Sequence, residues 1–179
     1  MIQWLISLLR RLPAWPMAAL LLVGFLVCNM GFDWRSEQLG CDVKLLDVRG
    51  WYTPSEARDL LERLGEGGRS LYGATEVTLD FAFPLIYGSL FGLLILQLYS
   101  ESVAKWLISV PLIAVAADFF ENSLAAYLAW TFDGQASAVA WAAAVFTAVK
   151  MSAFLGAVAL ILVGGAVGVV GKTRSGRDG

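Results

Sequence analysis

Long apolar stretches alternate with shorter polar connections along most of this chain. Four of the apolar stretches are long enough to cross a lipid bilayer, because a helix needs about 20 apolar residues for one crossing. The pattern therefore predicts an all-α integral membrane protein, a four-transmembrane-helix bundle that forms a single membrane domain over residues 1–171. The expected spans cover approximately residues 14–31, 79–99, 106–132 and 138–170, and residues 172–179 form a polar C-terminal tail.

The first residues carry a separate helical pattern that precedes the first span. Residues 1–12 place Trp4 and four leucines at helical spacing beside Arg10 and Arg11, and Pro13 then breaks the run. An apolar stripe flanked by basic residues is typical of a helix that lies in the membrane interface. We therefore expect an N-terminal interfacial helix.

A polar segment separates the first two spans. Residues 33–80 hold ten acidic and six basic side chains, and residues 33–78 are expected to form a helical extracytoplasmic loop. Four spans place both termini on one side of the membrane, but the basic residues on the two sides are equal in number. Arg10 and Arg11 beside the first helix, together with the acidic loop, break this tie. The termini are therefore expected to be cytoplasmic.

The polar loop contains the start signal of a helix. Thr53, followed by Pro54 and Glu56, has the pattern of an N-cap with proline at the first helical position and a capping box. Leucines and an alanine then recur on one face, and Gly65 is expected to end the helix, with a turn at residues 67–68. The apolar face is expected to pack on the top of the bundle.

Composition supports the membrane class and excludes several functions. The chain is 58% hydrophobic with a mean hydropathy of +0.68, which is typical of integral membrane proteins. The net charge of −2 and the lack of a basic stripe exclude a nucleic-acid partner. The absence of histidine excludes a Ser/His pair, a His-ligated zinc and a His-ligated haem, so no cofactor or metal is expected. Cys28 and Cys41 form no CxxC motif, and either two free thiols or one bridge fits their positions.

Charged residues inside the expected spans mark the candidate site. Asp118, Glu121 and Asn122 share one helix face in the third span, and Lys150 lies in the fourth. At 1.5 Å per residue, Glu121 and Lys150 both lie about 17 Å below the outer ends of their spans. Antiparallel neighbouring helices would bring them into contact. Tyr87 and Asp80 form a further polar stripe on the second span, with Asp80 at the rim.

Several functions fit this polar group. A buried ion pair would fix the helix register without doing chemistry. Two carboxylates against one ammonium group instead leave an unbalanced charge, which favours a site for a proton, a cation or the polar head group of a lipid or small molecule, in a transporter-like bundle. Asp118 and Glu121 could also serve an intramembrane lipid-modifying enzyme as metal ligands or as an acid/base pair, although an enzyme is less expected.

A third hypothesis is a non-catalytic assembly or chaperone subunit of a membrane complex. Glycine pairs four residues apart let two helices approach closely, and they occur here at Gly88 and Gly92 and at Gly164 and Gly168. These faces predict a homo- or hetero-oligomer, and packing within one chain is the alternative use of the same pattern.

The string LxxLGxxGRxxY runs from Leu61 to Tyr72, and Asp80, Phe83-Pro84, Tyr87-Gly88 and the DFFEN segment at 118–122 follow it. This combination resembles a family of uncharacterised bacterial four-span membrane proteins. The resemblance implies a location in the bacterial inner (plasma) membrane and implies no activity. It also adds Arg69 and Tyr72 as residues that would hold an anionic head group at the interface. The alternative for Arg69 is a solvated pair with Glu66 or Glu76.

Overall fold

The computed structural model describes residues 14–40 and 44–175, and over these ranges the chain is helical without strands. The expected interfacial helix at residues 1–12 and the thiol of Cys41 lie outside the described residues. Four helical stretches are long and apolar enough to cross a membrane, as the hydropathy pattern predicts. The elements are α2 (Ala14–Gln38), η1 (Leu46–Val48), α3 (Pro54–Glu76), α4 (Leu79–Leu98), α5 (Glu101–Leu107), α6 (Ser109–Trp130) and α7 (Val139–Ser175).

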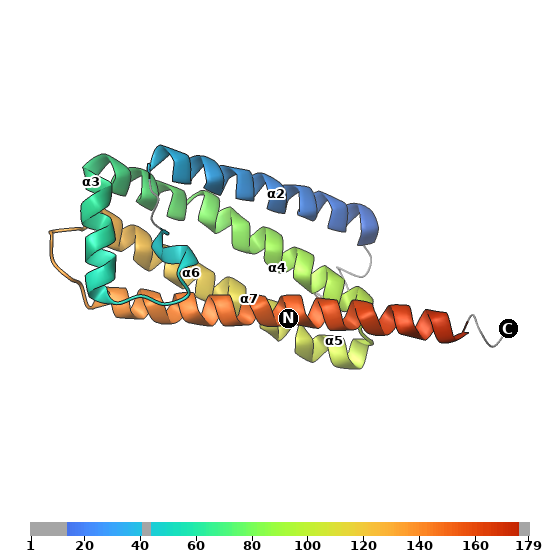
Figure 1. Cartoon of the computed structure of the whole chain (residues 1–179). Helices are drawn as coiled ribbons and strands as arrows, with labels where there is room; N and C mark the ends of the chain where they lie inside the picture. Colours follow the sequence, from blue (N-terminus) through green and yellow to red (C-terminus); the bar gives the residue numbers. More distant parts are fainter. Residues whose placement is uncertain (1–13, 41–43, 176–179) are drawn as a thin grey trace.

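The long helices form a bundle that is closed at one end by α3. Helices α4, α6 and α7 pack against one another, and α2 packs along α4 (Figure 1). The first part of α3 crosses the end of the bundle, whereas the start of α2 and the end of α7 lie toward the opposite end (Figure 1). This arrangement places α3, η1 and the α6–α7 connection at the same end of the bundle, which we call the α3 end.

Small residues set the close packing between helices. Alanines are buried where α6 meets α7, among them Ala125, Ala129, Ala140 and Ala143. Gly88 of α4 faces the side chain of Val115 on α6, so a Cβ at this position would collide with the neighbouring helix. Gly92 and Gly164 are likewise packed inside the chain, against Ile108 and Tyr99 respectively. These three glycines therefore serve packing within one chain, which is the alternative use of the pattern, and the formation of an oligomer stays a prediction.

Three of the long helices have different bounds from those that hydropathy predicts, and one of them, α7, continues to Ser175 into the expected polar tail. The first continues to Gln38 instead of ending at residue 31, because Arg35 finds buried partners there. The third begins at Ser109 instead of 106, because residues 101–107 form the separate short helix α5. Pro111 fits this start, since proline is tolerated in the first turn of a helix.

Helix α3 begins as its sequence predicts and continues beyond the expected end. The Thr53 side chain accepts a hydrogen bond from the Glu56 amide, and the Glu56 carboxylate accepts one from the Thr53 amide at 2.7 Å, which confirms the capping box. Gly65 has φ of 62°, a left-handed conformation that suits glycine, and it kinks the helix. The expected turn at residues 67–68 is wrong, because both residues are helical and the second part of α3 runs on to Glu76.

The apolar face of α3 covers the top of the bundle, as expected. Ala57, Leu60 and Leu61 are buried in one cluster with residues of α6 and α7, and Tyr52 completes this cluster from the segment before α3. Burial, reinforced by the negative charge of Glu121, raises the pKa of the Tyr52 hydroxyl above its ordinary value. Tyr52 is therefore a neutral group in the apolar cluster between α3 and the end of the bundle.

Candidate functional site

The polar residues of α6 meet a lysine of α7 inside the bundle. The Nζ of Lys150 lies 2.6 Å from Glu121 Oε2 and 3.3 Å from Asp118 Oδ1. The hydroxyl of Tyr87 on α4 donates a hydrogen bond of 3.0 Å to Asp118 Oδ2. All four side chains are buried. The contact predicted from helical phase and depth is therefore confirmed, and it joins α4, α6 and α7. We call Tyr87, Asp118, Glu121 and Lys150 the Lys150 cluster.

Helical periodicity explains why these side chains point inward. Asp118, Glu121, Asn122 and Ala125 are spaced at three and four residues and are all buried, whereas Phe120 between them is 59% exposed. The neighbouring apolar positions of α6 therefore cover the outside of the bundle, and the only charged residues of this helix face its interior.

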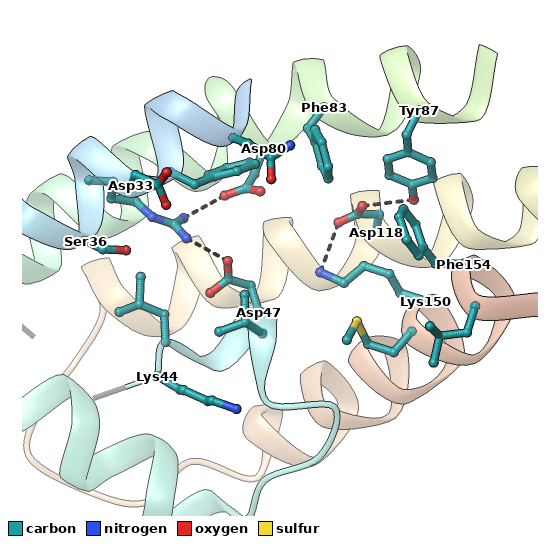
Figure 2. Close-up of a pocket in the computed structure, with 17 residues that line it drawn as sticks. Asp33, Ser36, Lys44, Asp47, Asp80, Phe83, Tyr87, Asp118, Lys150 and Phe154 are labelled. Carbon is teal, nitrogen blue, oxygen red and sulfur yellow. Dashed lines mark hydrogen bonds and ion pairs between the residues drawn. The ribbon is translucent and has the colours of Figure 1, made fainter. Parts of the chain in front are cut away.

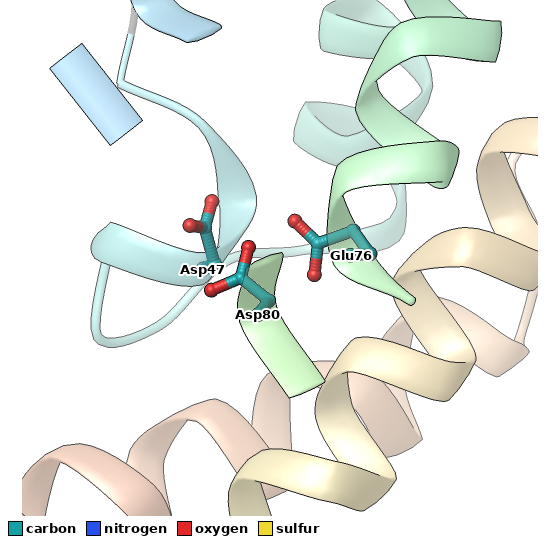
Figure 3. Close-up of side chains that lie close together, drawn as sticks. All are labelled: Asp47, Glu76 and Asp80. Atoms are coloured by element: carbon teal, nitrogen blue, oxygen red, sulfur yellow. The ribbon is translucent and has the colours of Figure 1, made fainter. Parts of the chain in front are cut away.

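A second ionic cluster surrounds Arg35 near the α3 end of the bundle. The guanidinium group of Arg35 on α2 lies 2.7 Å from Asp47 Oδ2, 3.1 Å from Glu76 Oε1 and 2.7 Å from Asp80 Oδ2. The three carboxylates converge from η1, α3 and α4, and each offers an oxygen within 4.8 Å of the others (Figure 3). The planar guanidinium thus compensates part of this negative charge and ties α2 to three other elements. We call these four residues the Arg35 cluster.

Sequence reasoning missed three members of this cluster. Asp80 is in the first turn of α4, as expected for a rim residue, but it is buried rather than solvated. The polar composition of residues 33–78 predicts an aqueous loop, and Arg35, Asp47 and Glu76 all fall inside it. One local signal is present: Tyr72, Glu76 and Asp80 follow one another at a spacing of four residues, and all three are buried.

Asn122 connects the two clusters. Its side-chain amide donates a hydrogen bond of 2.6 Å to the backbone carbonyl of Asp80. Asn122 follows Glu121 directly in α6. This bond therefore holds the backbone of Asp80, in the Arg35 cluster, next to the residue that follows Glu121 of the Lys150 cluster. A shift of α6 along α4 would therefore disturb both clusters.

A cavity of about 570 Å³ reaches both clusters (Figure 2). Its buried charged residues are Arg35, Asp47, Asp80, Asp118 and Lys150, and the exposed Asp33 and Lys44 also line it. Its apolar wall includes Phe83, Tyr87, Phe154, Met151 and Leu155. Exposed residues of three segments form the rim: Asn29 and Asp33 of α2, Lys44 and Val48 at and before η1, and Leu155 of α7. The cavity therefore lies between α2 and α7, is bordered by the η1 segment toward the α3 end, and opens at the side of the bundle.

The two clusters hold more acids than bases. Five buried carboxylates, Asp47, Glu76, Asp80, Asp118 and Glu121, stand against two buried cations, Arg35 and Lys150. If every group were ionised, the balance would be three negative charges in excess. Among the described atoms, one oxygen each of Asp47, Glu76 and Glu121 is buried without a hydrogen-bond partner. Buried carboxylates without enough counter-charge favour protonation or the binding of a positive group.

The two residues that the resemblance placed at the interface lie in different surroundings. Arg69 donates to the backbone carbonyl of Leu61 at 3.0 Å, and its guanidinium carbon is 4.8 Å from the centre of the Phe132 ring. Arg69 does not line the cavity. Tyr72 is buried, and its ring centre is 5.7 Å from the Arg35 guanidinium. Arg69 therefore belongs to the packing of α3, and Tyr72 belongs beside the Arg35 cluster.

Comparisons with known proteins add no relative to this description. No family model, curated protein sequence or solved structure matches the chain. The function must therefore be inferred from the chemistry of the two clusters and the cavity between them. Three properties stand out: an excess of buried carboxylates, an apolar wall beside them, and an opening at the side of the bundle.

Proposed function

We propose that this chain is an integral membrane protein whose cavity binds a positively charged species, which is a proton, a cation or a polar head group with a positive charge. The excess of buried carboxylates over buried cations at the cavity carries the proposal. The Lys150 cluster is the deep part of the site, and the Arg35 cluster is its outer part. A transporter-like role would use the same site.

Exposed tryptophans support the membrane assignment. Trp34, Trp51, Trp130 and Trp141 are each about half exposed, and their elements meet at the α3 end of the bundle. Trp15 and Trp106 are exposed at the opposite end, at the start of α2 and beside the start of α6. Tryptophans concentrate at both membrane interfaces. From Trp15 to Trp34 the helix rises about 29 Å, close to the ~30 Å thickness of a bilayer core.

This frame gives the two clusters different depths. Arg35 is adjacent to Trp34 and therefore lies at the level of the interface. Glu121 is nine residues from Trp130, and Lys150 is nine residues from Trp141, so both lie about 14 Å below the same interface. A charge near the middle of the bilayer is costly and is therefore a functional candidate. We place the protein in the bacterial inner membrane, with its termini in the cytoplasm and α3 outside.

The decisive experiment compares variants that differ in buried charge. Asp118→Asn with Glu121→Gln removes both acids but leaves Lys150 without a counter-ion, and this unpaired buried charge destabilises the fold by itself. The triple variant that adds Lys150→Met removes the whole charge group while keeping similar volumes. Glu62→Gln, an exposed acid on α3, is the matched control.

Each protein is purified in mild detergent, its bound molecules are identified by mass spectrometry, and its stability is measured against pH. The wild type and the Glu62→Gln control are expected to hold the same positively charged species and to show the same pH dependence. The folded triple variant is expected to lose both properties. Retention of both by the triple variant would refute the proposed function.

Other functions predict different outcomes of the same purification. A stable partner protein that co-purifies with wild type and triple variant alike would indicate an assembly subunit. A lipid-modifying activity that a chelator abolishes would indicate an enzyme that uses Asp118 and Glu121 as metal ligands.

A further inference from the structure

We infer that the ligand of the cavity is an amphiphile with a positively charged ammonium head group and a hydrocarbon tail, and that it enters from the bilayer between α2 and α7. This inference rests on the proposed function and names the ligand class of the same site. Three independent features of the cavity support it: its gradient of polarity, its charge and the position of its opening.

The charged side chains of the cavity lie in its middle and toward the α3 end, whereas its deepest lining on α7 is apolar. Asp33, Asp47 and Asp80 lie near the α3 end, at the level of the interface. Phe154 and Leu155 lie further along α7, about 6–8 Å deeper than Lys150 at 1.5 Å per residue. A lipid leaflet has the same order, with head groups outside and chains inside. An amphiphile in the cavity would therefore keep the orientation that it has in the bilayer.

The charge of the cavity selects a positive head group. Its lining contains four acids, Asp33, Asp47, Asp80 and Asp118, and three bases, Arg35, Lys44 and Lys150. Two further buried acids, Glu76 and Glu121, pair with Arg35 and Lys150 from behind this lining. An anionic head group would add to the excess of negative charge, whereas an ammonium group would reduce it.

Aromatic rings next to the acids also suit an ammonium group. The ring of Tyr87 lies 5.2 Å from that of Phe83 and 5.1 Å from that of Phe154, measured between centres. All three side chains line the cavity beside Asp118 (Figure 2). Ring faces attract alkylammonium groups, and the attraction grows when the site is shielded from water. The aromatic wall can therefore contact the methylene groups and the charge of the same head group.

The opening faces the region that the bilayer occupies in the proposed orientation. Helix α2 is held to the bundle mainly through α4, so its α7-facing side borders the cavity. Leu155 at the α7 side of the opening is 61% exposed and lies well below the level of the interface. A tail that leaves the cavity beside Leu155 would therefore continue directly into the hydrocarbon of the membrane.

The test uses probes with the same tail and different head groups. The wild-type protein in nanodiscs is titrated with dodecyltrimethylammonium, with dodecanoate and with tetramethylammonium, and binding is measured by calorimetry. Dodecyltrimethylammonium is expected to bind at least about tenfold more tightly than either of the others, a difference of about 1.4 kcal/mol. Binding of dodecanoate as tight as that of dodecyltrimethylammonium would overturn the inference, because it would show that a positive head group is not required. Equally tight binding of tetramethylammonium would also overturn it, because it would show that a hydrocarbon tail is not required.

A pair of variants tests the position of the opening. Leu155→Trp places a large side chain at the rim, while Leu162→Trp makes the same change seven residues further along α7, where the side chain is 68% exposed and does not line the cavity. Both positions are exposed, so both variants are expected to fold. Leu155→Trp is expected to weaken dodecyltrimethylammonium binding about tenfold or more, whereas Leu162→Trp is expected to bind as the wild type does. Equal binding by the two variants would refute access at this opening.

Failure of this inference differs from failure of the proposed function. If dodecyltrimethylammonium does not bind but a proton or inorganic cation binds and is lost in the triple variant, the ligand class is wrong and the proposed function stands. If no positive species depends on the Lys150 cluster, both are wrong.

Discussion

The ammonium group of Lys150 lies 2.6 Å from the carboxylate of Glu121, although the two residues are 29 positions apart and belong to different helices. Both side chains are at least nine-tenths buried. Removal of one partner would therefore leave a charge in a region of low dielectric constant, which costs far more than the pair itself contributes.

Lys150→Met is expected to lower the free energy of unfolding by about 3–5 kcal/mol, because it leaves Asp118 and Glu121 without a cation. Addition of Glu121→Gln should restore a large part of this loss, since fewer buried charges then remain uncompensated. Thermal unfolding of the single and double variants in detergent measures the interaction. A single variant as stable as the wild type would show that the two groups do not depend on each other.

Arg35→Gln is expected to loosen α2, because Arg35 is the residue of α2 that pairs with η1, α3 and α4. Cys28 reports this change, since it lies in α2 and is only 5% exposed. In a Cys41→Ser background, N-ethylmaleimide should label Cys28 several-fold faster in the Arg35→Gln variant. Arg35→Lys should give an intermediate rate, because one ammonium group cannot replace the planar guanidinium fork.

The control for this labelling experiment is Arg58→Gln. Arg58 forms an exposed ion pair with Asp59 on α3, and such pairs contribute little to stability. Its loss should leave the labelling rate of Cys28 unchanged. Equal rates in the Arg35→Gln and wild-type proteins would mean that α2 is held by its apolar contacts with α4 alone.

Gly88→Ala tests the close approach of α4 and α6. A Cβ at this position would collide with Val115, whose branched side chain has little freedom to move. We expect a loss of about 1–3 kcal/mol in the free energy of unfolding, as is typical of overpacking. Val115→Ala in the same chain should recover much of this loss. Gly67→Ala should not destabilise the protein, because its new Cβ would meet nothing within 4 Å apart from its chain neighbours and the backbone of its own helix.

The local sequence pattern predicts the long helices and the Lys150 cluster, but it does not predict the Arg35 cluster. Hydropathy locates the four long helices, and helical phase with depth brings Lys150 to Glu121, because both depend on regular spacing along one helix. The partners of Arg35 lie 12, 41 and 45 positions away, on three separate elements. A periodic pattern within one segment cannot predict contacts between side chains of four separate segments.

The polar composition of residues 33–80 also concealed this cluster. An average over the segment predicts contact with water, whereas the structure buries four of its charged side chains, Arg35, Asp47, Glu76 and Asp80. Their charges become compatible with burial only when the four meet. The cavity could not be predicted for the same reason, since it depends on how α2 is placed relative to α7.

The proposed orientation predicts which ends of the helices meet the outside of the cell. Glu66 and Asp133 are exposed at the α3 end of the bundle, and Glu101 is exposed at the start of α5, at the other end. We expect a membrane-impermeant maleimide to label Glu66→Cys and Asp133→Cys in intact spheroplasts. Glu101→Cys should be labelled only after the membrane is permeabilised. The experiment uses a background in which Cys28 and Cys41 are replaced by serine.

The labelling pattern tests the orientation of the bundle and its insertion in the membrane separately. Labelling of Glu101→Cys in intact spheroplasts, with protection of the other two positions, would place the termini outside and would put the Arg35 cluster at the cytoplasmic interface. Labelling of all three positions without permeabilisation would contradict a membrane-spanning bundle. The expected pattern would instead place the Arg35 cluster at the outer interface, with the Lys150 cluster about 14 Å below it. In that orientation an amphiphile from the outer leaflet meets the polar end of the cavity with its head group and the apolar end with its tail.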